Sequence, residues 1–212
     1  SAVRGSSGGI FFNQGEVCSA GSRILVEQKV YDEFLSGLSE RTRTIRVGDP
    51  LDPETYMGPV VSDEQFDRVM SYIDIGKDEG ARLVTGGERL GEKGYFVQPT
   101  IFADVDNSMR IAQEEIFGPV ASVIPVKDLD DAVRIANESA YGLAAAVWTR
   151  DVAKAHDAAH RLKAGTVWVN TYGATDTRSP WGGFKDSGFG RELGRQTLDL
   201  YTEYKAVWIS LK

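Results

Sequence analysis

Strand-like and helix-like segments alternate along most of this chain, and that alternation restricts its fold more than any other feature. From residue 23 onward, short runs rich in Val, Ile and Leu are followed by stretches with apolar residues at helical spacing. Repeated strand and helix pairs favour an α/β domain with a mainly parallel sheet that has helices on both faces. A chain of 212 residues is long enough to bury a substantial core in one such domain.

The individual segments can be assigned from periodicity and turn residues. Helices are expected over residues 31–45, 63–80, 129–140, 151–162 and 191–201, and strands over 23–30, 82–87, 95–105, 121–126, 144–149, 165–170 and 203–211. Ser62 and Asp63 are expected to cap the second helix, and the proline- and glycine-rich stretch 47–62 predicts an ordered surface loop. The last strand follows the helix that closes the domain, so we expect it to leave the main sheet and pair elsewhere.

Charge and cysteine content narrow the classes of function. The net charge is −7, with 31 acidic against 24 basic residues and no long basic run, which argues against nucleic acid or an anionic membrane as a partner. No stretch has the length of a membrane span, and the first residues lack a signal-peptide pattern. One cysteine excludes an internal disulfide and favours a reducing compartment, so we expect the cytoplasm. The absence of an initiator methionine fits a fragment or a processed product.

Cys18 is the only thiol, and its surroundings leave two interpretations open. A free cysteine often acts as a small buried apolar residue. Gly15 and Gly21 lie three residues to either side, however, and Ser19, Ala20 and Ser22 are small. Backbone amides in such a segment can approach a ligand closely, lower the pKa of a thiol and hold an oxyanion. A nucleophile is therefore the second interpretation.

Histidine-dependent chemistry has little support in the sequence. A hydrolase nucleophile at Cys18 would need a histidine base, and only His156 and His160 are available. Glu16 occupies the position where a nucleophile elbow needs glycine. The two histidines form "HDAAH", which resembles a zinc motif with Asp157 in place of glutamate, but no third ligand is indicated. We therefore expect structural histidines and no metal site.

Two further segments have a simple structural interpretation when taken alone. The stretch "SGFGRELG" at 187–194 misses the spacing of a dinucleotide-binding glycine loop and predicts a tight turn entering a helix. The stretch "QEEIFGPV" at 113–120 predicts a charged helix end that runs into a strand.

Taken together and in order, these segments resemble the aldehyde dehydrogenase superfamily. "FFNQGEVCSAGSR" resembles its catalytic-cysteine signature, and "EEIFGPV" resembles its cofactor-contacting signature. "SPWGGFKDSGFGRELG" and "YTEYKAV" resemble its C-terminal segment, so the resemblance covers essentially the whole chain. It implies the C-terminal catalytic domain of an NAD(P)-dependent aldehyde dehydrogenase.

The resemblance also implies roles for individual residues. Cys18 corresponds to the thiol that attacks an aldehyde carbonyl to form a thiohemiacetal, with its own backbone amide helping to hold the oxyanion. Glu115 corresponds to the glutamate that binds the nicotinamide ribose of NAD or NADP, and Phe117 to the aromatic residue beside it. The resemblance further implies Leu143 for cofactor binding, Val17, Ser19, Asn170 and Trp181 for the substrate pocket, and Glu192 for a proton relay.

Departures from the family pattern bear on what this chain does alone. The family's general-base glutamate, in an L-E-L-G-G-K segment, its oxyanion asparagine and its nucleotide-binding domain all lie upstream of the matched region. Residues 1–200 are then expected to form a truncated catalytic domain, and residues 201–212 a strand that pairs with another subunit of a homodimer or homotetramer. By itself the chain is expected to be a poor dehydrogenase. A thiol-dependent esterase and a non-catalytic fragment stay open, as do the identity of the aldehyde and the choice between NAD and NADP.

Overall fold

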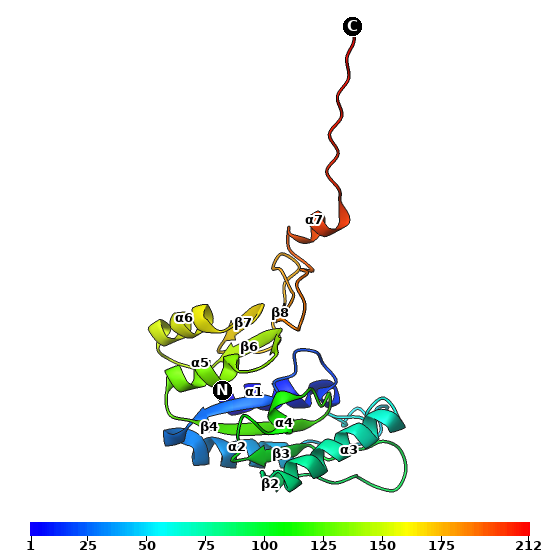
Figure 1. Cartoon of the computed structure of the whole chain (residues 1–212). Coiled ribbons are helices and arrows are strands. Elements are labelled where there is room, and N and C mark those ends of the chain that lie inside the picture. The colour runs from blue at the N-terminus through cyan, green and yellow to red at the C-terminus, as the bar shows by residue number, and fades with distance from the viewer.

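A four-stranded sheet lies at the centre of the structure, a computed structural model that describes all residues from 1 to 212 (Figure 1). Its strands, in spatial order, are β1 (Arg23–Glu27), β4 (Val120–Val126), β3 (Thr100–Ala103) and β2 (Arg82–Thr85). β1 and β3 both pair with β4 in parallel, and β2 pairs antiparallel with β3 at the edge. The predicted α/β class with a mainly parallel sheet is therefore confirmed.

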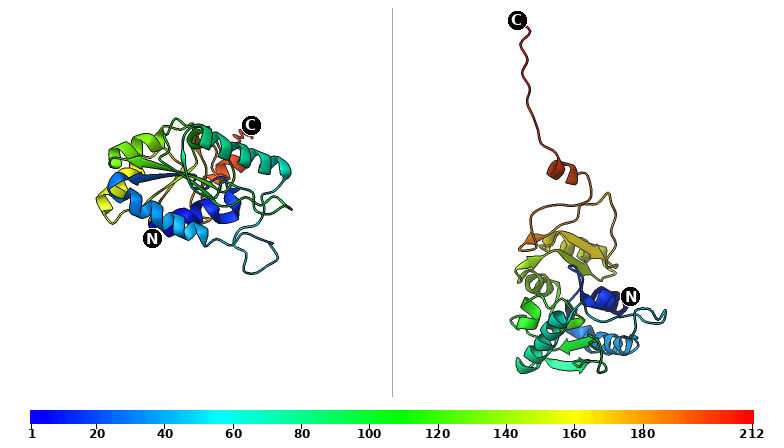
Figure 2. Two further views of the ribbon diagram at one scale, coloured as in Figure 1. Left: turned by 90° about the horizontal axis from the view of Figure 1, so that it is seen from below. Right: turned by 90° about the vertical axis from the view of Figure 1, so that its right-hand side faces the viewer.

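Helices cover both faces of this sheet, as Figure 2 shows in its left view. The covering helices are α1 (Ala2–Phe11) and α2 (Tyr31–Arg43) on one face, and α3 (Asp63–Asp78), α4 (Arg110–Gln113) and α5 (Leu129–Asn137) on the other. Neighbouring residues of a strand point to opposite faces, so Ala121 and Val123 of β4 join the core beneath α1 and α2. Val120 and Ile124 join the core beneath α3 and α4.

Side-chain caps fix where three of the helices begin. The Ser62 hydroxyl accepts a hydrogen bond from the Gln65 amide at 3.2 Å, which confirms the predicted cap of α3, whereas Asp63 is the first helical residue. Asp128 caps α5 in the same way, and Asp151 caps α6 (Val152–Arg161). None of the helices has the combination of length and apolar composition that crossing a membrane requires.

The strands after residue 140 form two small sheets of their own. β6 (Ala144–Val147) and β7 (Thr166–Val169) pair in parallel on either side of α6 in the sequence, and β5 (Tyr141–Gly142) pairs antiparallel with β8 (Phe184–Lys185). No ladder of backbone hydrogen bonds joins β6 to β1. The predicted strands at 144–149 and 165–170 are therefore present, but outside the four-stranded sheet.

Helix α1 was not expected from the sequence, because three of its ten residues are glycine and each glycine disfavours a helix by about 0.5–1 kcal/mol relative to alanine. Tertiary contacts explain two of these glycines. A β-carbon at Gly5 would lie 2.0 Å from the ring of Trp148, and one at Gly9 would lie 3.1 Å from the ring of Tyr172. The glycines let two aromatic rings pack directly on the helix backbone, and this packing outweighs low helix propensity.

The C-terminal region departs most from the sequence-based expectations. Of the helix predicted over 191–201, only α7 (Thr197–Tyr201) forms, because Leu193 and Gly194 adopt left-handed conformations with φ of 57° and 59°. Residues 202–212 form neither helix nor strand and extend away from the rest of the molecule (Figures 1 and 2). The strand predicted at 203–211 therefore has no pairing partner within this chain.

Candidate active site

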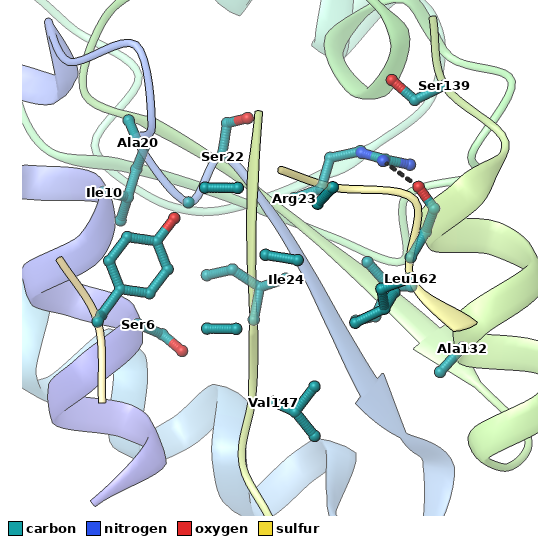
Figure 3. A pocket seen from close by; sticks show the side chains of 18 of the residues that line it. Ser6, Ile10, Ala20, Ser22, Arg23, Ile24, Ala132, Ser139, Val147 and Leu162 are labelled. Carbon is teal, nitrogen blue, oxygen red and sulfur yellow. Dashed lines mark hydrogen bonds between the residues drawn. The ribbon is translucent and has the colours of Figure 1, made fainter. Parts of the chain in front are cut away.

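A pocket of about 750 Å³ lies between β1 and β6 and is bordered by α1 and α5 (Figure 3). Six of the nine residues singled out in the sequence line it, namely Val17, Cys18, Ser19, Glu115, Phe117 and Leu143. The catalytic-cysteine and cofactor-contacting signatures, almost one hundred positions apart in the chain, thus meet at one cavity.

Cys18 lies on a turn between α1 and β1 and is exposed. The Ala20 amide donates to the Val17 carbonyl at 2.9 Å and closes this turn, which we call the cysteine turn (residues 17–20). The interpretation of Cys18 as a small buried apolar residue is therefore wrong. An exposed thiol without a hydrogen-bond partner is available to attack a carbonyl carbon.

The residues before the cysteine turn are held in an uncommon conformation. Asn13 and Gln14 have φ of 49° and 57°, values that cost energy for any residue other than glycine. Hydrogen bonds from the loop at 47–62 hold Gln14 and the nearby Glu16. The Gly58 amide donates to the Gln14 side chain at 3.2 Å, and the Val61 amide donates to the Glu16 carboxylate at 3.0 Å. The predicted surface loop therefore supports the site.

The segment that carries Glu115 and Phe117 packs backbone to backbone against the start of the cysteine segment. A β-carbon at Gly15 would lie 2.2 Å from the carbonyl oxygen of Gly118, so the two segments can approach only because residue 15 is glycine. Phe117 itself has φ of 59°. Phe117 lies between the end of α4 and the start of β4 and turns the chain from one into the other. The helix end and following strand predicted at 113–120 are therefore present.

Two side chains of α3 hold this segment through its backbone. Gln65 Nε2 donates to the carbonyl of Ile116 at 3.0 Å and to that of Phe117 at 2.7 Å, and Arg68 donates to the carbonyl of Glu115. Positions three apart lie on one face of a helix, so both side chains reach the same turn. The Glu115 carboxylate has no hydrogen-bond partner in the chain and is exposed, which leaves both of its oxygens free to accept hydroxyl groups.

Glu114, beside it, has the opposite environment. Tyr72 donates to its carboxylate at 2.6 Å, and Arg110 donates to both oxygens at 2.9 Å. Arg110, and after it Tyr72, lower the pKa of Glu114 to about 2 from an ordinary value of 4.5. Glu114 is therefore fixed to α3 and α4, whereas the adjacent Glu115 is exposed to solvent at the pocket.

The lowered pKa of Glu114 predicts that this residue contributes to the stability of the folded chain in a pH-dependent way. The charged form of Glu114 stabilises the folded chain, so its contribution is complete above about pH 4.5 and disappears as the pH falls towards 2. Glu114→Gln should lower the free energy of unfolding slightly at neutral pH, and the difference from wild type should vanish in acid. Chemical denaturation of both proteins at several pH values measures the difference in free energy of unfolding. Glu92→Gln is the control, because Glu92 is exposed and its carboxylate has no ion-pair partner. A difference in free energy of unfolding that stayed constant with pH would show that the pKa of Glu114 is not lowered by folding.

The remaining predicted residues lie outside the pocket lining. Asn170 uses both atoms of its side-chain amide on the backbone of Thr149, accepting from its amide at 3.0 Å and donating to its carbonyl at 2.8 Å. Asn170, just after β7, is thereby tied to the residues just after β6. Trp181 and Glu192 exchange two backbone hydrogen bonds of 2.7 Å with each other. The substrate and proton-relay roles of these three residues stay predictions.

The two histidines are exposed on α6, and neither lines the pocket that contains Cys18. Asp157, between them, forms an ion pair of 2.8 Å with Arg161. The structure therefore does not bring Cys18 and a histidine base together.

Sequence comparison matches residues 1–207 to the model of the aldehyde dehydrogenase family. The putative aldehyde dehydrogenase DhaS of Bacillus subtilis is 52% identical over 211 residues, which cover all of this chain and 43% of that protein. An aldehyde dehydrogenase of Aspergillus niger is 52% identical over 206 residues, which cover 97% of this chain and 41% of that protein. The chain thus spans less than half the length of these relatives.

Solved structures agree with the sequence comparison. An NAD⁺ complex of an aldehyde dehydrogenase from Bacillus cereus superposes with a TM-score of 0.96 at 48% identity, covering 100% of this chain and 43% of that one. The aldehyde dehydrogenase KauB of Pseudomonas aeruginosa superposes with a TM-score of 0.95 at 53% identity, covering 99% and 43%. The chain belongs to the aldehyde dehydrogenase family.

Proposed function

We propose that this chain is the C-terminal catalytic part of a longer enzyme that oxidises an aldehyde to a carboxylic acid with NAD⁺ or NADP⁺. One observation carries the proposal: the exposed thiol of Cys18 shares a pocket with the unpaired Glu115 carboxylate and with Phe117. Similar structures from Bacillus cereus and of an indole-3-acetaldehyde dehydrogenase are complexes with NAD⁺. A reducing compartment such as the cytoplasm suits an exposed free thiol.

The chemistry of the side chains fits a nicotinamide cofactor. A carboxylate without a partner, as at Glu115, can accept the two hydroxyl groups of a ribose, and a half-exposed ring, as at Phe117, offers an apolar surface beside it. Leu143 lines the same pocket. These three residues would hold the nicotinamide end, and the bound cofactor would supply the hydride acceptor for the reaction.

Cys18 would perform the covalent part of the reaction. Its thiolate sulfur bonds to the aldehyde carbon, and the carbonyl electron pair moves to the oxygen, which the Cys18 backbone amide helps to stabilise. Loss of hydride from that carbon leaves a thioester. Attack by water then breaks the C–S bond, releases the acid and restores the thiolate. Four acids line the pocket, namely Glu27, Glu114, Glu115 and Asp151. Glu27 and Glu114 are paired with basic side chains, Asp151 caps α6 and Glu115 is assigned to the cofactor, so we place the general base for this last step in the other half of the enzyme.

The test uses the full-length protein that contains residues 1–212. Aldehyde and NAD⁺ should yield one reduced nicotinamide per aldehyde, and alkylation of Cys18 with iodoacetamide at neutral pH should end turnover. Unchanged turnover after complete labelling of Cys18 would refute the proposal. Ester hydrolysis that needs Cys18, without any aldehyde oxidation, would support a thiol-dependent esterase instead, and inactivity on both substrates would support a non-catalytic role.

Replacement of Glu115 by glutamine should separate the two half-reactions. An amide accepts two ribose hydroxyls less well than a carboxylate, so the hydride-transfer rate of the full-length enzyme should fall by roughly 10- to 100-fold. Acylation of Cys18 by an activated ester does not need the cofactor and should change little. Stopped-flow measurement of both rates decides this, with Glu40→Gln on α2 as a matched control. Equal losses in the two assays would indicate a general structural defect.

We further propose that residues 201–212 pair with another subunit of a homodimer or homotetramer. From residue 202 onward the backbone is extended and unpaired, and large apolar side chains such as Trp208 and Ile209 are 94% and 77% exposed. Glu203 and Lys205 would then lie at or near the interface. Deletion of residues 201–212 from the full-length protein should lower the molar mass measured by light scattering. An unchanged mass with unchanged thermal stability would contradict this role.

A further inference from the structure

Tyr172 lies beneath the cysteine turn, although it follows that turn by more than 150 positions. It comes from the loop after β7, and its hydroxyl donates a hydrogen bond of 2.6 Å to the carbonyl oxygen of Ser19. Its ring packs against that of Trp168, with the centroids 4.9 Å apart. Trp168 is itself buried and donates through Nε1 to the Ala174 carbonyl at 2.8 Å, so the tyrosine ring is supported from behind.

The cysteine turn has no other hydrogen bond to a distant part of the chain. One backbone bond closes the turn, and a second, local one runs from the Ser22 amide to the Ala20 carbonyl at 2.9 Å. The bond from the Gly21 amide to the Gly9 carbonyl at 2.9 Å connects the residue after the turn to α1. The Cys18 side chain itself makes no hydrogen bond. The geometry of the thiol therefore depends on how well the Ser19 carbonyl is held.

Two glycines shape the space that Tyr172 fills. A β-carbon at Gly21 would lie 3.0 Å from the tyrosine hydroxyl oxygen, and one at Gly9 would lie 3.1 Å from its ring. Both distances are shorter than ordinary contacts of a β-carbon. The helix before the cysteine turn and the residue after it therefore both leave room for this one side chain, which places its hydroxyl against the turn.

We propose that Tyr172 is a positioning residue for the catalytic thiol: its hydrogen bond to the Ser19 carbonyl fixes the turn on which Cys18 is presented. The inference rests on the proposed role of Cys18 as nucleophile. The bond fixes the peptide group after Ser19, and with it the direction of the neighbouring Cys18 side chain. A nucleophile has to be held within about 3–3.5 Å of the carbonyl carbon at a suitable angle, so a small rotation of this turn slows attack.

The protonation of Tyr172 suits this role. Burial raises the pKa of its hydroxyl well above the ordinary value, so the group stays protonated and keeps donating over the whole neutral and mildly alkaline range. Tyr172 keeps its proton and does not exchange it with the substrate. It acts only through the backbone that carries Cys18.

Tyr172→Phe in the full-length enzyme tests the inference, because it removes one oxygen and keeps the ring that packs against Trp168. Loss of one hydrogen bond, worth about 0.5–1.5 kcal/mol, corresponds to a fall in kcat of up to about tenfold. The KM for NAD⁺ should stay the same. Independently of activity, hydrogen exchange measured by mass spectrometry should speed up in the peptide that contains residues 16–22. Tyr95→Phe is the matched control, since the Tyr95 hydroxyl has no hydrogen-bond partner.

The outcomes separate this inference from the proposed function. If the wild-type enzyme lacks turnover that depends on Cys18, the proposed function itself fails. If wild type turns over and Tyr172→Phe shows unchanged exchange in residues 16–22, the hydrogen bond does not hold the turn and the inference is overturned. Faster exchange with unchanged kcat overturns it as well, because the bond would then be structural only. Faster exchange together with lower kcat and unchanged KM supports it.

Discussion

Cys18→Ser in the full-length enzyme is expected to lower the rate of aldehyde oxidation by roughly four to six orders of magnitude. The serine hydroxyl has nearly the shape of the thiol but is almost entirely protonated at neutral pH, so it is a poor nucleophile. Cys18 is exposed and makes no side-chain hydrogen bond, so the replacement should leave the fold intact. The loss should therefore be confined to the chemical step.

Three measurements distinguish this result from misfolding. The thermal unfolding midpoint and the affinity for NAD⁺, measured by calorimetry, should match wild type, while the rate of NADH formation falls. Ester hydrolysis should be lost in parallel, since it uses the same acyl-enzyme. A variant whose oxidation rate stayed within about tenfold of wild type would exclude Cys18 as the nucleophile.

Gly15→Ala is expected to lower the free energy of unfolding by about 3 kcal/mol or more. Residue 15 has φ of 73°, which disfavours any side chain, and a β-carbon there would lie 2.2 Å from the Gly118 oxygen and 2.5 Å from its carbonyl carbon. Both obstacles are backbone atoms, so no change of rotamer relieves them. The segments that carry Cys18 and Glu115 would have to separate, and activity should fall together with stability.

Gly91→Ala is the matched control for that substitution. Gly91 also has a positive φ, 70°, but no atom lies within 4 Å of a β-carbon built there. It should therefore show only the conformational cost of a left-handed residue, about 1–2 kcal/mol. Chemical denaturation of both variants gives the difference. Equal losses would show that the contact between Gly15 and Gly118 contributes nothing to the fold.

Local signals in the sequence were sufficient for much of the fold. Helices α3, α5 and α6 have both an apolar periodicity and a capping side chain, at Ser62, Asp128 and Asp151 respectively, and each lies close to its expected position. Helix α1 lacks such signals. This helix is stabilised by the packing of Trp148 and Tyr172 on its glycines, and both aromatic residues lie far away in the chain.

The candidate active site likewise contains residues that the sequence indicates and residues that only the structure reveals. Cys18, Glu115 and Phe117 lie in segments that resemble a family signature, and the structure places all three at one pocket. Gln65 and Tyr172 could not have been found in this way. Each donates to a backbone carbonyl, an acceptor that every residue has, so no side-chain pattern marks the pairing. The strand predicted at 203–211 does not form in this structure, because a strand needs a pairing partner and residues 1–212 provide none for it.

The support that Tyr172 gives to Ser19 has a consequence for synthesis. The two residues are 153 positions apart, so on the ribosome the cysteine turn has to wait for most of the remaining chain before its anchor emerges. Contacts this distant in sequence close slowly, after local helices and the hairpin of β2 and β3 have formed. Until Tyr172 has been made, the cysteine turn therefore lacks its anchor, and the Cys18 side chain has not yet taken the direction that it has in the folded chain.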